Sequence, residues 1–420
     1  MEEWKEYKLG DILNFRRGHD LPKSEMRAGN IPVAGSNGII GYHDTATPVS
    51  PCITIGRSGN VGTPYIYDKC WAHNTVLYVD DFKGNNPLYL FYLLKTLPLS
   101  SFGGGSAVPT LNRNHIHPLL VHHTSDLKLQ ERIANLLKSL DDKIECNRRI
   151  NDNFTFPLLL LTCFVLWLLK LRNDNLVQQA QALFKSWFVD FEPYKGSGFE
   201  ETEIGRIPKD LLVKRVSEIP HTIETGRRPK GGVGEITSGV PSVGAEHVKG
   251  LGNYDYSKTK YITEEYASSL KTGKVNGYEL LIYKDGGKPG YFIPNYSIFG
   301  EGYPFEECFL NEHVFKLDFG NKGYNAFCYF YFWTDYVMNY LNAQGGKAAI
   351  PGINRQDIEN IQIFAPENEL VKRFGDIVLP SIRQILFNCK ESRRLAQLRD
   401  TLLPRLMSGE LKVNEVDCLS

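Results

Sequence analysis

Residues 105–113 read GSAVPTLNR, and residues 347–355 read KAAIPGINR. Pro109 and Pro351 are 242 positions apart, and so are Asn112 and Asn354. The offset continues through the apolar positions that follow, and in both copies a helical pattern begins within about ten residues. A repeat at more than half the length of this 420-residue chain indicates one plan used twice, a globular domain followed by a helix.

The two globular parts, residues 1–125 and 205–365, are rich in Gly, Pro and Tyr. They also contain short β-branched and aromatic runs, such as CITI at 52–55 and ELLIY at 279–283. Short runs of this kind between turn residues are typical of strands. We therefore expect two β-rich domains in an α+β fold.

The two helical parts, residues 126–195 and 366–412, carry apolar residues at heptad spacing. The positions are Leu129, Ile133, Leu137, Leu140 and Ile144 in the first part, and Leu370, Phe374, Ile377, Leu395, Leu398 and Leu402 in the second. Either stripe alone is also typical of an amphipathic helix that packs on its own domain. Two similar long helices in one chain favour an antiparallel coiled coil, with a kink expected at Pro380.

Residues 154–175 interrupt the first helical part. NDNF at 151–154 is repeated as NDNL at 173–176, and residues 157–169 between them form an apolar run broken only by Thr162. The run is shorter than the roughly 20 residues that span a bilayer, so a buried or looped-out insertion is the better interpretation. We expect the helix to break near residues 155–157, and Leu176 to resume the heptad stripe where Phe154 would have stood.

Composition sets limits on function. The chain has 48 basic and 48 acidic side chains, so it is not a strong polyanion binder by itself, and partners are expected to share the phosphate contacts. Its eight cysteines contain no C-x-x-C pair, which is typical of reduced thiols in the cytoplasm and argues against zinc. The charged N-terminus has no apolar run behind it, which also favours the cytoplasm. We expect no bound metal.

Two longer motifs close the helical parts. Residues 183–193 read LFKSWFVDFEP, and residues 398–411 read LRDTLLPRLMSGEL. Both closely resemble the conserved regions of specificity (S) subunits of Type I restriction-modification systems, and the order of domain, helix, domain, helix matches along nearly the whole chain. One local departure is Asp210-Leu211, which stands where that family usually has Gly-Trp.

The resemblance implies that each domain is a target-recognition domain for one half of a split site in double-stranded DNA, while the helices fix the spacing. It implies two modification (methyltransferase) subunits with S-adenosylmethionine along the helices, and restriction (translocase-nuclease) subunits with ATP and Mg²⁺. It also implies that this chain is not an enzyme and holds no cofactor itself.

Two alternatives come from other classes of protein. A methyltransferase or nuclease in its own right is disfavoured, because the chain lacks G-x-x-x-x-G-K-[ST], Asn-Pro-Pro-aromatic or Asp-Pro-Pro-aromatic, and H-E-x-x-H motifs. A coiled-coil scaffold or membrane-tethered interaction protein would use the helices and the apolar run at 157–169.

The candidate DNA-binding residues lie in glycine-containing loops, because Arg or Lys recognises guanine and Asn recognises adenine. In the first domain they are Arg16, Arg17, Asn37, Arg57, Asn60, His73 and Asn74, and in the second Arg227, Arg228, Lys230, Lys284, Lys288 and Lys347. Each of them also fits a solvated turn. Asn112 and Asn354, each after a proline, are expected to cap the next element instead.

The candidate partner-binding residues are apolar or aromatic side chains of the two closing motifs, which exceed what a two-helix stripe needs. They are Phe184, Trp187, Phe188, Phe191, Leu402, Leu403 and Leu406.

Overall fold

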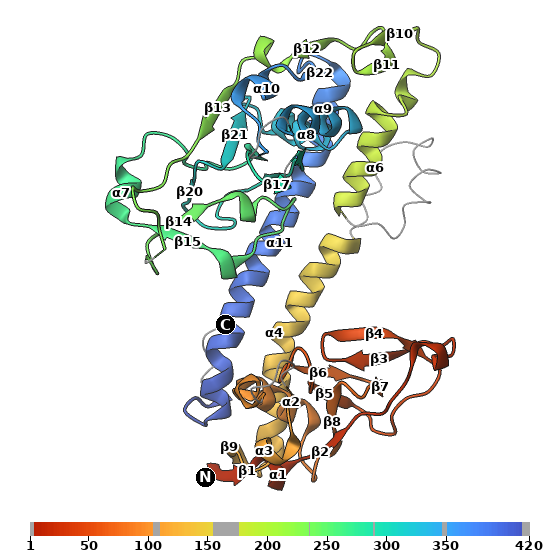
Figure 1. Ribbon diagram of the computed structural model, residues 1–420, viewed down its shortest axis with the longest axis vertical. Helices are drawn as coiled ribbons and strands as arrows, with labels where there is room; N and C mark the ends of the chain where they lie inside the picture. The colour runs from red at the N-terminus through yellow and green to blue at the C-terminus, as the bar shows by residue number, and fades with distance from the viewer. Residues whose placement is uncertain are drawn as a thin grey trace. The chain divides into compact units, whose positions relative to one another are not determined.

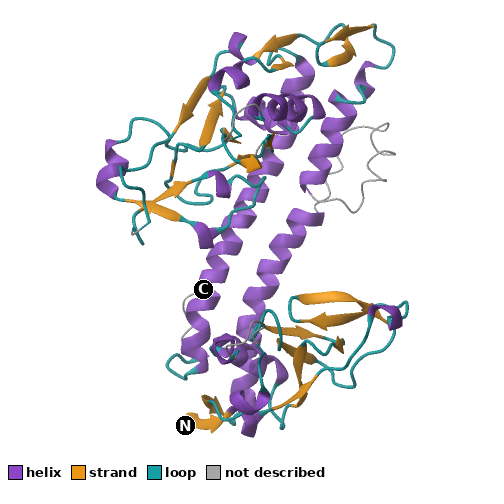
Figure 2. Cartoon of the chain, viewed as in Figure 1, coloured by secondary structure: helices purple, strands orange, loops and turns teal. Residues whose placement is uncertain are grey.

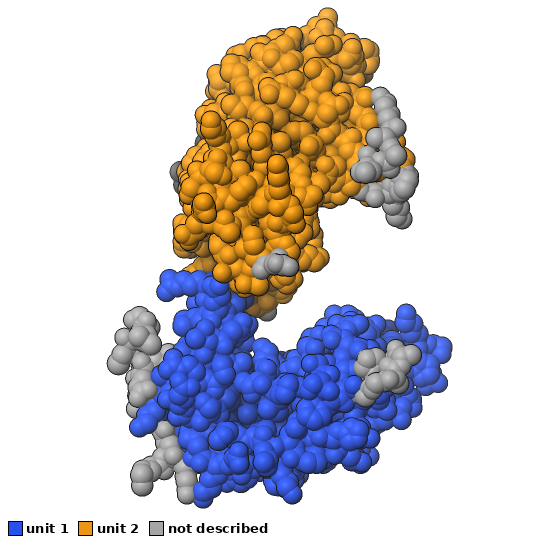
Figure 3. All heavy atoms as spheres, turned by 60° about the vertical axis from the view of Figure 1, so that its left-hand side comes forward, with its two compact units in different colours: residues 1–144, 394–420 blue, residues 145–393 orange. Residues whose placement is uncertain are grey.

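The computed structural model describes residues 4–103, 110–153, 176–234, 236–288, 290–346 and 351–413. The chain divides into two compact units (Figure 3). Unit 1 consists of residues 1–144 and 394–420, and unit 2 of residues 145–393. Each unit contains one β-rich part and segments of long helix (Figure 2). The expected α+β fold with two β-rich parts and long helices is confirmed.

Unit 1 begins with its β-rich part (Figure 1). The strands are β1 Trp4–Lys8, β2 Asn14–Arg17, β3 Ile31–Gly35, β4 Gly38–His43, β5 Cys52–Gly56, β6 Pro64–Tyr67, β7 Trp71–Ala72, β8 Val76–Asp81 and β9 Leu120–Thr124. The helices are α1 Leu9–Ile12, α2 Pro87–Thr96, α3 Arg113–Ile116, the first part of α4 Leu127–Asn153 and the end of α11 Glu369–Met407.

Unit 2 has the more elaborate β-rich part. Its strands are β10 Phe199–Thr202, β11 Gly205–Pro208, β12 Val213–Arg215, β13 Thr222–Thr225, β14 Val240–Val243, β15 Lys260–Ile262, β16 Leu280–Tyr283, β17 Gly287–Lys288, β18 Tyr291–Phe292, β19 Tyr296–Ile298, β20 Phe309–Leu310, β21 Val314–Asp318 and β22 Gln362–Phe364. Its helices are the last part of α4, α6 Leu176–Phe188, α7 Glu264–Ser269, α8 Lys322–Phe332, α9 Asp335–Gly345, α10 Arg355–Glu359 and most of α11 Glu369–Met407.

The sheets of the two units have the same topology. The four-stranded order β2-β8-β5-β6 in unit 1 corresponds to β13-β21-β16-β19 in unit 2. In the three-stranded sheets, β3 has β4 as an antiparallel and β7 as a parallel neighbour, and β14 has β15 and β20 in the same senses. The two-stranded sheet β1-β9 corresponds to β12-β22. The internal repeat seen in the sequence therefore extends to these three sheets of each unit.

Equivalent helices also begin in the same way. The Asn86 side chain accepts a hydrogen bond from the Tyr89 backbone at the start of α2, and the Asn321 side chain accepts one from Tyr324 at the start of α8. An asparagine at this position satisfies a backbone N–H that the helix cannot. Asn112 and Asn354 likewise cap α3 and α10, which confirms their expected role.

Within unit 1, α4 packs against the end of α11. Leu129, Ile133 and Leu137 are buried in one core with Leu402 and Leu406. Leu398, expected in the apolar stripe, is 40% exposed, so that assignment is wrong. The physical reason is that Arg399, not Leu398, turns toward α4 and binds Asp141.

Within unit 2, α6 packs against the first part of α11. The rings of Phe184, Trp187 and Phe188 surround Phe374, with centroid distances of 5.6, 6.4 and 5.6 Å. Edge-to-face packing of this kind suits the charge distribution of aromatic rings. The helix α11 continues without a break through Pro380.

The helix pairing in unit 2 is antiparallel. The Asn147 amide donates to Glu391 Oε2 at 2.5 Å, and the Arg373 guanidinium lies 5.8 Å from the centre of the Trp187 ring. Forty positions separate Asn147 from Trp187, whereas 18 separate Arg373 from Glu391. The excess of 22 equals the length of segment 154–175. The segment itself, with the expected break at 155–157, lies outside the described residues.

In each unit, side chains fasten the β-rich part to the helices. In unit 1, Asp141 of α4 accepts hydrogen bonds from Tyr92 of α2 at 2.8 Å and from Arg399 of α11 at 2.5 Å. In unit 2, the Arg393 guanidinium of α11 lies 4.2 Å from the centre of the Tyr256 ring. These contacts attach the β-rich part of each unit to its long helices.

Candidate nucleic-acid interface

Three loops of unit 1 meet at one edge of the β-rich part. Backbone hydrogen bonds join them: His19 N donates to Ala72 O at 2.8 Å, His73 N to Ala34 O at 3.0 Å, and Arg57 N to Thr75 O at 2.8 Å. The approach is so close that a Cβ on Gly18 would lie 2.0 Å from the carbonyl oxygen of His73. The loop that follows β2 therefore depends on glycine at this point.

The β3–β4 hairpin adds a fourth loop to this edge. Its two-residue turn, Ser36 and Asn37, lies beside the loop after β5, since a Cβ on Gly59 would be 3.7 Å from Ser36 Oγ. Asn37 and Asn60 are both exposed here. The candidates Arg17, Asn37, Arg57, Asn60, His73 and Asn74 are thus brought together, although they are spread over 58 positions of sequence, from 17 to 74.

Arg16 lies one residue further into β2, opposite Tyr78 of β8. Burial raises the pKa of Tyr78, while Arg16 acts in the opposite direction. Arg17, the next residue, is 3.8 Å from the carboxylate of Asp20, which also accepts a hydrogen bond from Asn74. The basic and amide side chains on this edge therefore lie beside the Asp20 carboxylate.

The same edge of unit 2 carries a denser polar network. Arg228 Nε pairs with Glu312 Oε1 at 2.5 Å, and His313 Nδ1 lies 2.6 Å from Asp285 Oδ1. Lys284 Nζ donates to the backbone oxygen of Glu312 at 3.1 Å. The loops after β13 and β16 and the loop before β21 therefore converge, as their counterparts do in unit 1.

The remaining candidate DNA-binding residues of unit 2 are Arg227, Lys230, Lys288 and Lys347. Arg227 and Lys230 are exposed in the loop after β13. Lys288 pairs through its backbone with Tyr291 in the β17–β18 hairpin, and its side chain is not described. Lys347 lies outside the described residues.

Arg57 and Lys284 occupy equivalent positions, each one residue past the central strand β5 or β16. Arg57 O accepts from Leu111 N at 2.7 Å, and Lys284 O accepts from Ile353 N at 2.8 Å. Arg57 N donates to Thr75 O and Lys284 N to His313 O. Both basic residues are thus held by the same pair of backbone hydrogen bonds.

Sequence reasoning missed the acidic members of these edges, Asp20, Asp285 and Glu312. Carboxylates are not expected beside phosphates, so their residue type gave no signal. Their positions relative to the repeated strands indicate that they lie on these edges, but this can be recognised only once the strand pairing is known.

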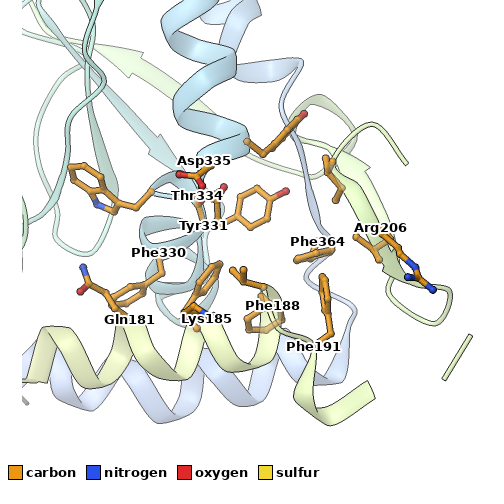
Figure 4. Close-up of a pocket in the computed structure, with 16 residues that line it drawn as sticks. Gln181, Lys185, Phe188, Phe191, Arg206, Phe330, Tyr331, Thr334, Asp335 and Phe364 are labelled. Carbon is orange, nitrogen blue, oxygen red and sulfur yellow. Dashed lines mark hydrogen bonds between the residues drawn. The ribbon is translucent and has the colours of Figure 1, made fainter. Parts of the chain in front are cut away.

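A second candidate surface is an open pocket of about 560 Å³ in unit 2 (Figure 4). The aromatic rings of Phe188, Phe191, Phe330 and Tyr331 line it, and its charged lining residues include Lys185. Phe184 also contributes to the lining. Three candidate partner-binding residues therefore border this pocket.

The other candidate partner-binding residues lie within the units. Trp187 is buried in the core of unit 2, and Leu402, Leu403 and Leu406 are buried in the core of unit 1. Phe184 and Phe188 are also mostly buried despite bordering the pocket. These side chains stabilise their own unit, and what they offer a partner is the surface that they support.

The described residues contain no group of three or more His, Cys, Asp or Glu that could hold a metal ion. No helix among them is both long and apolar enough to cross a membrane.

Comparison with known proteins shows what this chain is similar to. Residues 1–154 match the family model of the Type I restriction modification DNA specificity domain. The chain is 27% identical over 338 residues to the Type I restriction enzyme MjaIX specificity subunit of Methanocaldococcus jannaschii, which covers 78% of this chain and 70% of that protein. The chain is therefore similar to Type I specificity subunits.

A second specificity subunit, of the Type I restriction enzyme HindI of Haemophilus influenzae, is 26% identical over 339 residues and covers 68% of each chain. A crystal structure of a Type I restriction-modification system S subunit from M. genitalium shares the fold, with a TM-score of 0.60, 16% identity, and coverage of 97% of this chain and 96% of that one. The resemblance to Type I specificity subunits is confirmed. The relatives in sequence are specificity subunits, which agrees with the expectation of a non-catalytic chain.

Proposed function

We propose that this specificity subunit reads a split site in double-stranded DNA, with one half-site for the β-rich part of each unit. The observation that carries the proposal is the equivalence of Arg57 and Lys284, which lie on the same loop-built edge in both units. A subunit with two similar readers needs two half-sites. Arg and Lys are the side chains that most often contact phosphates and guanine, so both edges have suitable chemistry.

The helices would set the distance between the half-sites. Asp141 joins Tyr92 to Arg399 in unit 1, and Arg393 packs on Tyr256 in unit 2, which supports a fixed attachment of each reader to helix. A helix rises about 1.5 Å per residue, so a helix pair converts residue number into distance along DNA.

Two modification (methyltransferase) subunits would dock along the helices and bring S-adenosylmethionine to the adenines of each half-site. Restriction (translocase-nuclease) subunits would add ATP- and Mg²⁺-dependent translocation and cleavage, while this chain binds no cofactor and works in the cytoplasm. The pocket beside Phe188 and Phe191 supports a docking role, because it places an apolar surface next to the helix end. Val189, which also lines it, is 50% exposed.

The test is a methylation map of DNA from a host that produces this chain with its modification subunit. We expect a motif of two short parts separated by a fixed number of unspecified bases. Footprinting of the purified complex then assigns the readers: Arg57→Ala should weaken protection over one half only, and Lys284→Ala over the other. A continuous motif, or loss of both halves in either variant, would contradict the proposal.

A further inference from the structure

A side-chain link between two loops recurs at equivalent positions in the two units, with different chemistry. Phe15 of β2 pairs with Val79 of β8, and Ile223 of β13 pairs with Leu317 of β21. Asp20 is five residues after Phe15 and Arg228 five after Ile223, while Asn74 is five before Val79 and Glu312 five before Leu317. Asn74 donates to Asp20, and Arg228 pairs with Glu312.

The backbone around the two linked pairs is also equivalent in the two units. Gly18 and Gly226 stand two residues before Asp20 and Arg228, and a Cβ on either would collide with backbone. The residues directly before Asn74 and Glu312 also make equivalent hydrogen bonds. His73 N donates to Ala34 O, and Asn311 N donates to Val243 O. The backbone is therefore matched on both sides of the link.

Stability does not explain why the link persists. The Arg228 and Glu312 side chains are 51% and 32% exposed, and an exposed ion pair contributes little to folding. A link that only fastened two loops would also have no reason to change from an acid–amide pair to a base–acid pair between two copies of one fold.

DNA binding explains why the basic residue is kept at Arg57 and Lys284 while the linked pair changes between the two units. Its phosphates carry the same charge in every sequence, so a contact to them can stay the same in two readers of different sequence. Base edges differ, so contacts to them must change: Asn suits adenine, Arg suits guanine, and Glu accepts from cytosine.

We propose that Arg57 and Lys284 hold the DNA backbone in the two half-sites, and that the pairs Asp20–Asn74 and Arg228–Glu312 read base edges. The proposal rests on the proposed function and adds which positions confer specificity. In unit 1 the link orients the Asn74 amide toward adenine. In unit 2, Glu312 orients the Arg228 guanidinium, whose free N–H groups suit guanine.

The experiment transplants the unit 1 pair into unit 2 with the double substitution Arg228→Asp and Glu312→Asn. The full chain, in complex with its modification subunit, is used to select binders from a DNA library. We expect the base preference to change at one or two neighbouring positions of one half-site, by on the order of 10- to 100-fold. The other half-site should keep its sequence.

Two single variants serve as controls. Lys284→Ala should weaken binding to all sequences alike and lower the slope of log affinity against log salt by about one, without changing the ranking of bases. Lys322→Ala removes a lysine paired with Glu301 beyond the opposite end of β21, and should change neither quantity.

Unchanged base preference in a double variant that binds normally would overturn the proposal and leave the pair a loop fastener. If the double variant does not fold, the uncharged pair Arg228→Gln and Glu312→Gln replaces it, and the base preference must change at the same positions of that half-site. A wild-type complex that selects no split site would instead overturn the proposed function.

Discussion

Deleting residues 154–175 is expected to leave the spacing between the two half-sites unchanged. In unit 2, the contacts of Glu391 with Asn147 and of Arg373 with Trp187 align the helices as though 22 residues of the first one were not counted. A ruler made of the paired helices therefore has the same length with or without this segment.

The alternative is separated from this expectation by a large distance. If the 22 residues were straight helix, they would add about 33 Å at about 1.5 Å per residue, close to one turn of DNA. The deletion would then change the spacer by about ten base pairs. The two outcomes, no change and about one turn, can be distinguished without ambiguity.

The assay is the methylation map of a host that carries the deletion variant and the modification subunit. A second variant that lacks one heptad, residues 138–144, is the control for sensitivity, because it shortens described helix by about 10 Å and removes Asp141. The control should alter or abolish methylation. A spacer that shifts by about one DNA turn in the 154–175 deletion would refute the argument from the helix register.

Three further predictions test the structure. Phe374→Ala should destabilise unit 2 by about 3–5 kcal/mol in chemical denaturation, because this fully buried ring joins α6 to α11, and a cost below about 1 kcal/mol would contradict that role. Burial lowers the pKa of His123 to about 4, so the unfolded chain gains its proton first and stability should fall as the pH drops from about 6.5 to about 4; His123→Phe should reduce this loss, measured by thermal unfolding across that range, and an identical profile would exclude His123 as a cause. Val189→Asp should reduce the amount of modification subunit that co-elutes with this chain on size-exclusion chromatography. Leu212→Asp changes a similarly exposed residue outside the pocket lining and should leave co-elution unchanged. Equal loss of co-elution in both variants would count against the pocket as the docking surface.

Much of the fold could be predicted because it depends on local patterns. Asn112 and Asn354 cap their helices as expected, since an N-cap needs only a polar side chain at the right place in a short segment. Leu129, Ile133 and Leu137 are buried because heptad spacing puts them on one face of α4. Leu398 has the same spacing, but it is exposed because α11 turns the neighbouring Arg399 toward Asp141 of α4 instead.

The candidate edges show where sequence stopped being sufficient. The loops after β5 and β16 read RSGN and KDGG, which have little in common beyond a basic residue and glycine. Nothing in either loop indicates that Arg57 and Lys284 are equivalent, or that Asp20 meets Asn74. Strand pairing decides both, because hydrogen bonds between β2 and β8 join residues more than 50 positions apart. The sequence alone determined that one domain plan is used twice, because helix caps and hydrophobic periods are properties of neighbouring residues; only the tertiary structure decided which side chains share an edge, because that depends on contacts between distant ones.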